Sequence, residues 1–219
     1  MEDRSGKQQS TNNNSYQMKF LKLNRDGRSA FTPYRPSTIL TNLQRGNIKT
    51  QSIREIPERT VFELAAQGEL YLHHLDAGGV DQVDENGFTP LIWAAGYGQL
   101  TTVKMLIAGG ANPKVRGKNG ESALSFAATN GHVHVLRYLI ARDVNVNEYD
   151  EEGNTALMYA AYNNHTLCVH ELLKAKADLT IQNCNLETAF SIAVMRKSKQ
   201  VQIILERHVL NLFSGDLMT

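Results

Sequence analysis

The chain has 219 residues, of which 42% are hydrophobic and 21% are charged, and its formal net charge is +1. This is enough apolar material for one domain with a sizeable core. No run approaches the ~18 consecutive apolar residues of a transmembrane helix, and the first residues lack the apolar stretch of a secretory signal. Membrane insertion is therefore not expected. Two cysteines, Cys168 and Cys184, are too few for a disulfide framework, which favours reduced thiols in an intracellular protein.

Charge is distributed unevenly along the chain. Residues 1–56 contain ten Lys or Arg and four Asp or Glu, whereas the remainder carries a net charge of −5. The segment 1–15 is polar and rich in Asn and Ser, so it buries too little apolar surface to fold. We predict a disordered, basic N-terminal arm over residues 1–56. One hypothesis is that this arm contacts nucleic acid. Its arginines are scattered, so such contact would be non-specific and salt-dependent, and no specific nucleic-acid partner is expected.

Folded structure is expected from about residue 57. The segment TVFELAAQGELYLHHLDAGG matches the helix pair of the next unit when Gly68 is aligned with Gly98. The segment is slightly shorter than that unit. Terminal repeats often diverge because one of their faces meets water. Residues 57–83 are thus predicted to form an N-terminal capping unit.

Three copies of one pattern follow at a constant spacing of about 33 residues. They read DENGFTPLIWAAGYGQLTTVKMLIAGGANP from Asp84, GKNGESALSFAATNGHVHVLRYLIARDVNV from Gly117 and DEEGNTALMYAAYNNHTLCVHELLKAKADL from Asp150. This period with a T-P-L-x-x-A-A core resembles the ankyrin repeat, a β-turn followed by two helices. The predicted units are residues 84–116, 117–149 and 150–182. Asn86-Gly87 suits a turn with positive φ, and Thr89-Pro90 suits a helix start.

A fifth, divergent unit closes the chain over residues 183–219. Thr188 and Leu205 keep the spacing of the earlier units, while Leu186 replaces the turn glycine. The long final helix is expected to seal the stack through Ile203, Ile204 and Leu212. The predicted fold is an all-α ankyrin-repeat solenoid of about five helix-turn-helix units with β-turn tips, preceded by the disordered arm.

The candidate functional surface is a row of aromatic residues. The position two before the second alanine of each alanine pair is not required for packing, and in the three copies it holds Trp93, Phe126 and Tyr159. Their rings should form a ladder on the concave face, which solenoids use for binding, and Trp and Tyr are frequent interface anchors. The alternative is that the rings merely cover the alanine-rich inner helices.

Four neighbouring residues extend this surface. They are Phe88 at the turn tip, Tyr97 one helical turn after Trp93, and Asn130 and Asn163, whose amides suit a peptide backbone. Together these side chains favour an extended peptide with small apolar or proline side chains. Because Trp93 is a surface position, its replacement by alanine is expected to cost about 2 kcal/mol in binding with little loss of stability.

Neither catalysis nor metal binding is indicated. His132 and His165 stand at equivalent positions of successive copies, which the repeat itself explains. No cysteine or second histidine stands at zinc-ligand spacing, and His170-Glu171 lacks the H-E-x-x-H frame. Neither G-x-S-x-G nor a phosphate-binding loop is present. We predict a non-enzymatic protein with no metal and no other cofactor.

The segments STILTNLQRGN, ELAAQGEL, DENGFTPLIWAA and VQIILERHVLNLF are similar to those of ankyrin-repeat proteins of the RFXANK / ankyrin repeat family A group. The resemblance implies a nuclear and cytoplasmic adaptor in transcription regulation that binds linear motifs containing proline and leucine. The partners it implies are RFX-type transcription factors, class IIa histone deacetylases and the tail of an endocytic receptor. The last partner leaves open a role as a cytoplasmic linker. Trp93 and Tyr159 match aromatic positions of the group, whereas Phe126 replaces leucine, Glu151 replaces tryptophan and Glu187 replaces tyrosine.

Overall fold

The computed structural model describes residues 59–75 and 79–215. The chain divides into two units at residue 57, and every described residue belongs to the second unit, residues 57–219. The predicted basic arm therefore lies outside the described residues. The elements are α2 (Val61–Gln67), the 3-10 helix η1 (Leu72–His74), α3 (Pro90–Gly96), α4 (Leu100–Ala108), α5 (Ala123–Thr129), α6 (Val133–Ile140), α7 (Ala156–Tyr162), α8 (Thr166–Lys174), α9 (Ala189–Met195) and α10 (Lys199–Gly215).

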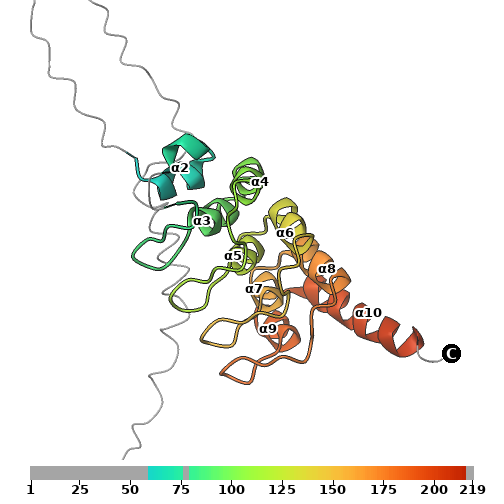
Figure 1. The fold of residues 1–219 in the computed structure, drawn as a ribbon. Coiled ribbons are helices and arrows are strands. Elements are labelled where there is room, and N and C mark those ends of the chain that lie inside the picture. The colour runs from blue at the N-terminus through green and yellow to red at the C-terminus, as the bar shows by residue number, and fades with distance from the viewer. Residues whose placement is uncertain (1–58, 76–78, 216–219) are drawn as a thin grey trace, which may run out of the picture. The chain divides into compact units, whose positions relative to one another are not determined.

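These helices lie in two rows (Figure 1). The inner row is formed by α2, α3, α5, α7 and α9, each packed against the next, and the outer row by α4, α6, α8 and α10. Each inner helix from α3 onward also packs against the outer helix that follows it. Hairpin loops precede α3, α5, α7 and α9, and two of them close with single antiparallel bridges, Arg116–Ser122 and Tyr149–Thr155. The predicted all-α solenoid with β-turn tips is confirmed.

Helices α3, α5, α7 and α9 begin with the same cap. Thr89, Ser122, Thr155 and Thr188 are the N-cap residues, and the side-chain oxygen of each accepts a hydrogen bond from the N–H three residues later. Such a cap satisfies one of the helix donors that have no partner within the helix. Pro90 follows Thr89 at the first helical position, where its missing N–H costs nothing. The repeated cap thus fixes where every inner helix starts.

Small residues set the distance between inner helices. The paired alanines of α3, α5 and α7 are fully buried, and the leucine that precedes each pair is buried as well. Alanine lets two helix backbones approach closely, and the leucines fill the space on each side. One continuous core cluster runs from Ala65 in α2 to Leu205 in α10. The stack is therefore held by nearest-neighbour contacts between units, as expected of a repeat protein.

Two recurrent sets of hydrogen bonds join neighbouring units. At the hairpins, the N–H groups of Lys118, Glu151 and Cys184 donate to the carbonyls of Asn86, Asn119 and Glu152 over 2.8–3.0 Å. Along the inner row, the side chains of Gln99, His132 and His165 lie 3.0 Å from the carbonyl oxygens of Ala66, Gly96 and Thr129. A carbonyl only accepts, so both histidines carry their proton on Nε2. Backbone groups at each contact are thereby satisfied.

Glycine makes room for these side chains. Gly98 has φ +74°, and a Cβ placed there would lie 2.5 Å from Nδ1 of His132. Gly131 stands in the same relation to His165, with φ +76° and 2.6 Å. A side chain at either position would meet both an unfavourable backbone conformation and a steric clash.

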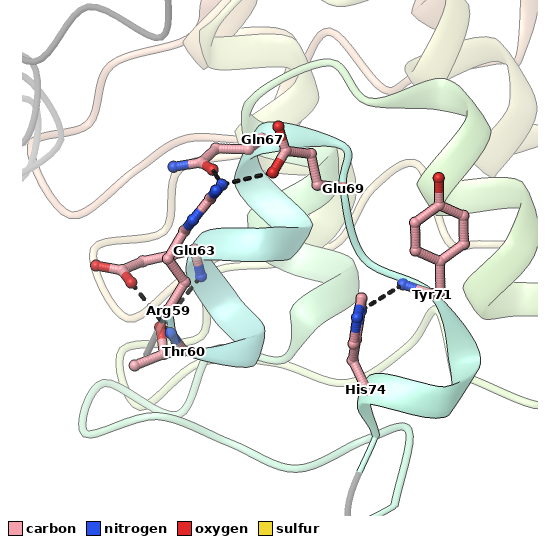
Figure 2. A network of polar contacts seen from close by, with 7 residues as sticks. All are labelled: Arg59, Thr60, Glu63, Gln67, Glu69, Tyr71 and His74. Atoms are coloured by element: carbon pink, nitrogen blue, oxygen red, sulfur yellow. Dashed lines mark hydrogen bonds and ion pairs between the residues drawn. The ribbon is translucent and has the colours of Figure 1, made fainter. Parts of the chain in front are cut away.

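The first unit departs from the repeat in its second helix. Its inner helix α2 has a complete capping box, in which Thr60 and Glu63 each accept a backbone N–H of the other. The expected second helix is reduced to the single 3-10 turn η1, where the backbone N–H of Tyr71 donates to Nδ1 of His74 (Figure 2). The shortening noted in the sequence thus falls on the outer helix.

The last unit differs from the prediction in how it closes the stack. Helix α10 is long, with 17 residues, but its buried contacts are made by Val201 and Leu205. Ile203 and Leu212, which we expected to seal the core, are 52% and 57% exposed. Ile203 is two residues from both Val201 and Leu205, so it lies on another face of the helix. Leu212 shares the face of Leu205 but lies two turns beyond it. Ile204, the third residue expected to seal the stack, is partly buried and packs against the core.

Candidate functional site

The predicted aromatic row is present on three successive inner helices. Trp93 lies on α3, Phe126 on α5 and Tyr159 on α7, each four residues after the N-cap of its helix. All three side chains are partly buried, so each has an accessible portion. Trp93 and Phe126 also pack against the core cluster. These two rings therefore help to cover the alanine-rich inner helices, and the accessible portion of each of the three side chains is the part that a ligand could contact.

Two of the three rings are held by a carboxylate. The indole Nε1–H of Trp93 donates to Oδ2 of Asp84 at 2.9 Å, and the hydroxyl of Tyr159 donates to Oδ2 of Asp150. In both units the aspartate lies nine residues before the ring. Its other oxygen accepts two N–H groups of the hairpin turn, those of Asn86 and Phe88 in the case of Asp84. The hairpin thus fixes the orientation of the ring. Burial, followed by the bond to Asp150, raises the pKa of Tyr159 well above its usual range.

The middle unit uses a different arrangement. Phe126 has no polar atom to anchor, and Gly117 stands where the two flanking units have aspartate. The carboxylate of Glu121 takes over the turn and accepts both the backbone N–H and the side-chain amide of Asn119, each at 3.1 Å. A Cβ on Gly117 would lie 2.5 Å from the ring of Phe88. Glycine at this position therefore makes room for an aromatic ring from the preceding hairpin.

The structure corrects the expected exposure of Phe88. This residue is only 9% exposed and does not form an open turn tip. Its ring packs edge-on against Phe126, with centroids 5.1 Å apart, and edge-on against Trp93 at 6.4 Å. Phe88 is therefore buried under the row, because Gly117 has no side chain to occupy the space that its ring fills.

Tyr97 extends the row on the α3 side. Its ring stacks on Trp93 with centroids 6.1 Å apart and an interplanar angle of 15°. Burial raises the pKa of its hydroxyl above the usual value, so the group is a neutral donor and acceptor at physiological pH. Phe88, Trp93, Tyr97 and Phe126 form one aromatic cluster across α3 and α5, which the spacing of Trp93 and Tyr97 by one helical turn predicted only in part.

Asn130 and Asn163 form hydrogen bonds within the chain that the sequence did not predict. The side-chain amide nitrogen of Asn130 donates to the carbonyls of Gly96 and Phe126, at 3.0 and 3.2 Å. That of Asn163 donates to Thr129 at 2.9 Å. We expected these amides to be offered to a peptide backbone. Their N–H groups instead join neighbouring units, so both residues hold the stack together next to the aromatic row.

His132 and His165 join neighbouring units of the stack. His132 and His165 bond the carbonyls of the preceding unit, and burial lowers the pKa of His132 despite its backbone hydrogen bond. Among residues 59–75 and 79–215, no group of three or more His, Cys, Asp or Glu is placed to hold a metal ion. Burial raises the pKa of the Cys168 thiol to about 11. In the described part of the chain, no helix is both long and apolar enough to cross a membrane.

Comparison with known proteins places this architecture. A family model described as ankyrin repeats (3 copies) matches residues 59–150 and 98–183, more than half of the chain. The chain belongs to the ankyrin-repeat family. Ankyrin repeats are protein-interaction domains, and adjacent units stack to form one extended surface.

Two named ankyrin-repeat proteins are similar to the chain. The human protein named Ankyrin repeat family A protein 2 is 43% identical over 91 residues, which are 40% of this chain and 29% of that protein. Human DNA-binding protein RFXANK is 44% identical over 86 residues, or 37% of this chain and 33% of that protein. The matched region thus spans about a third of the length of these curated relatives. The predicted resemblance to this group is confirmed over that region.

Sequence reasoning missed the carboxylates that orient the rings. The signal was nevertheless present: an ankyrin unit of this chain has aspartate at the hairpin start only where its ring has a polar donor. Asp84 occurs with Trp93 and Asp150 with Tyr159, whereas Gly117 occurs with Phe126 and Asn183 with Ile192. An alignment of the units shows that the aspartate and the polar ring occur together, which predicts a hydrogen bond between them.

Proposed function

We propose that the aromatic row binds an extended peptide containing proline and leucine side chains, and that the protein is a non-enzymatic adaptor in transcription regulation. The observation that carries the proposal is the repetition of a partly exposed ring at one position of three consecutive inner helices. Apolar side chains arranged contiguously on a surface commonly mark an interaction site.

Spacing supports an extended ligand. Packed helices lie about 8–10 Å apart, so successive rings recur at about that interval. A polyproline II segment rises about 3.1 Å per residue and completes a turn in three residues, which gives a similar repeat of about 9 Å. A peptide in that conformation would present one side chain in three to successive rings. Proline favours this conformation and packs well against aromatic faces.

The polarity of the row suggests which side chains fit where. Phe126 is apolar and lies between two rings that carry polar donors, so an aliphatic side chain such as leucine suits the centre. The hydroxyl of Tyr159 and the indole N–H of Trp93 both point to their aspartates, so the ring faces are the groups that would contact a ligand. Enzymatic activity is not part of the proposal, because the row contains no nucleophile–base pair.

Partners and location are proposed by similarity. The relatives include a protein named DNA-binding protein RFXANK, which favours RFX-type transcription factors as partners, with class IIa histone deacetylases as further candidates. A nuclear and cytoplasmic distribution follows from such partners. The tail of an endocytic receptor is a partner of the same peptide chemistry in a cytoplasmic setting.

Trp93 is the only tryptophan, so its fluorescence reports directly on the row. We expect a Pro-x-Leu-Pro peptide to shift this emission with saturation, and Tyr159→Ala to weaken binding about 30-fold, equivalent to about 2 kcal/mol. Tyr71→Ala is a matched control, since Tyr71 immediately precedes η1, is 59% exposed and lies outside the row. Trp93→Ala is less suitable than the sequence suggested, because it removes the fluorescent reporter and a side chain that packs against the core. A peptide that leaves the emission unchanged, or binds both tyrosine variants equally, would contradict the proposal.

A further inference from the structure

The inner helices at the two ends of the described stack differ in the side chains around them. At the first unit, polar side chains surround α2: Arg59 bonds to Gln67 and Glu69, and Thr60 forms a capping box with Glu63 (Figure 2). Polar outer faces of this kind are normal for terminal repeats. At the last unit, the helices present Phe190, Val194 and Ile203, which are 39%, 48% and 52% exposed. We call these three residues the C-terminal end face.

Each residue of the C-terminal end face occupies a stacking position. Phe190 and Val194 are the equivalents, one unit on, of Leu157 and Ala161 of α7, which are 1% and 0% exposed because α9 packs over them. Ile203 is equivalent to Arg137, whose guanidinium reaches forward to Glu171 of the following unit at 2.9 Å. All three side chains therefore point to where another unit would lie.

A further unit with a histidine at this contact does not fit there. Lys197 is equivalent to Gly98 and Gly131, where a Cβ would lie about 2.5 Å from the histidine of the following unit. It is also equivalent to Asn164, whose following unit has Ser198 in place of that histidine. Lys197 carries that Cβ, with φ +57°.

Two charged residues border the C-terminal end face. Lys197 projects to this side by the argument from Gly98 and Gly131. Glu187 is equivalent to Asn154, which accepts a bond from Asn183 of the following unit, and one oxygen of Glu187 also accepts the side-chain amide of Asn183 in its own unit at 2.9 Å. Glu187 lies just before α9 and Lys197 just after it. The face therefore has a negative group at one end of α9 and a positive group at the other.

We propose that the C-terminal end face binds the same face of a second copy of the chain, with the two α9 helices antiparallel about a two-fold axis at Ile192. Phe190 and Val194 lie two residues before and after Ile192, and Glu187 and Lys197 lie five before and after it. One axis therefore places the large Phe190 opposite the small Val194 of the partner copy. The same axis places Glu187 opposite Lys197. Such self-complementarity is what a two-fold interface requires.

Ile203 on α10 widens this contact, and Leu210, two turns further along α10 and 64% exposed, extends it. A few apolar side chains and two ion pairs form a small interface compared with the about 800 Å² per partner of standard complexes. We therefore expect reversible dimerisation at micromolar concentrations. The interface is distinct from the aromatic row, so the dimer would carry two peptide-binding surfaces.

Sedimentation velocity of the full chain over a range of micromolar concentrations tests the proposal. The weight-average mass should rise with concentration towards that of a dimer. Val194→Asp should weaken association tenfold or more, because it places a carboxylate against the ring of Phe190 in the partner copy. Leu167→Asp is the control: Leu167 is 67% exposed on α8, outside the C-terminal end face, and its replacement should leave association unchanged. A chain that stays monomeric throughout, or two variants that behave alike, would overturn the proposal.

Charge reversal tests the two-fold geometry itself. Glu187→Lys alone brings two lysines together at each contact, and Lys197→Glu alone brings two glutamates together, so each variant should be monomeric. Mixed in equal amounts, the two variants should form a heterodimer with both ion pairs restored, and this gain should diminish at high salt. Far-UV circular dichroism checks that each variant is folded. A mixture of folded variants that remains monomeric would refute the antiparallel arrangement.

Discussion

Replacing Asp84 by asparagine tests whether a carboxylate holds the Trp93 ring in place. One oxygen of Asp84 accepts the turn N–H groups of Asn86 and Phe88 at 2.8 Å each, and the other accepts the indole N–H at 2.9 Å. Asparagine keeps an oxygen for the two turn bonds, as Asn183 does in the last unit. Its amide nitrogen, however, would face the indole donor. The substitution should therefore remove the indole bond and leave the turn intact.

The expected magnitude follows from the nature of the bond. A hydrogen bond to a charged group contributes about 1.5–3 kcal/mol, and both side chains are partly exposed, which favours the lower end. We expect Asp84→Asn to lower the free energy of unfolding by about 1.5 kcal/mol. In a Trp93→Phe background the ring has no N–H, so the same change should cost about 0.5 kcal/mol, leaving a coupling energy of about 1 kcal/mol.

The assay is urea denaturation of the four members of the cycle, followed by far-UV circular dichroism because Trp93→Phe removes the only tryptophan. Asp81→Asn is the control. Its carboxylate accepts the Asn112 N–H at 3.1 Å, at a surface contact between units that does not involve the ring, so its effect should add to that of Trp93→Phe. If the cycle with Asp84 is additive within about 0.3 kcal/mol, the carboxylate does not anchor the indole.

Three further outcomes are expected. Gly98→Ala should destabilise by about 2–3 kcal/mol through its left-handed backbone and the displaced His132 bond, whereas Gly110→Ala, with φ +95° and open space around it, should cost only about 1 kcal/mol; equal shifts in melting temperature would contradict the clash. Leu186→Gly should stabilise by about 0.5–1 kcal/mol in denaturant titrations, because Leu186 has φ +60°, and a loss would argue against backbone strain there. Burial lowers the pKa of His132 in the folded state, so its contribution to stability is full above about pH 6.5 and falls as the pH drops below that value. His132→Gln should flatten this dependence, while His134→Gln, at an exposed position, should retain it.

The repeat could be predicted from the sequence because stacking requires the same types of residue in every unit. Caps at Thr89 and its equivalents, buried alanine pairs, and glycines with positive φ are local or nearest-neighbour requirements, so each must recur once per unit. A departure from the repeat could also be recognised in the sequence. Leu186 in place of the turn glycine keeps a positive φ, which shows that the backbone follows the repeat even where the residue does not.

Only the tertiary structure shows which contacts a side chain makes with a neighbouring unit. Phe88 was predicted as surface, and only the contact with the next unit shows that Gly117 leaves room to bury it. The amides of Asn130 and Asn163 were expected from the sequence to bind a peptide backbone, yet they donate hydrogen bonds to carbonyls of the preceding unit. Spacing along one chain fixes which face a residue occupies, but hydrogen-bond partners and exposure depend on distances between units. The sequence by itself therefore determined the solenoid and the row of rings, while packing between units determined which of their polar atoms are already bonded within the chain.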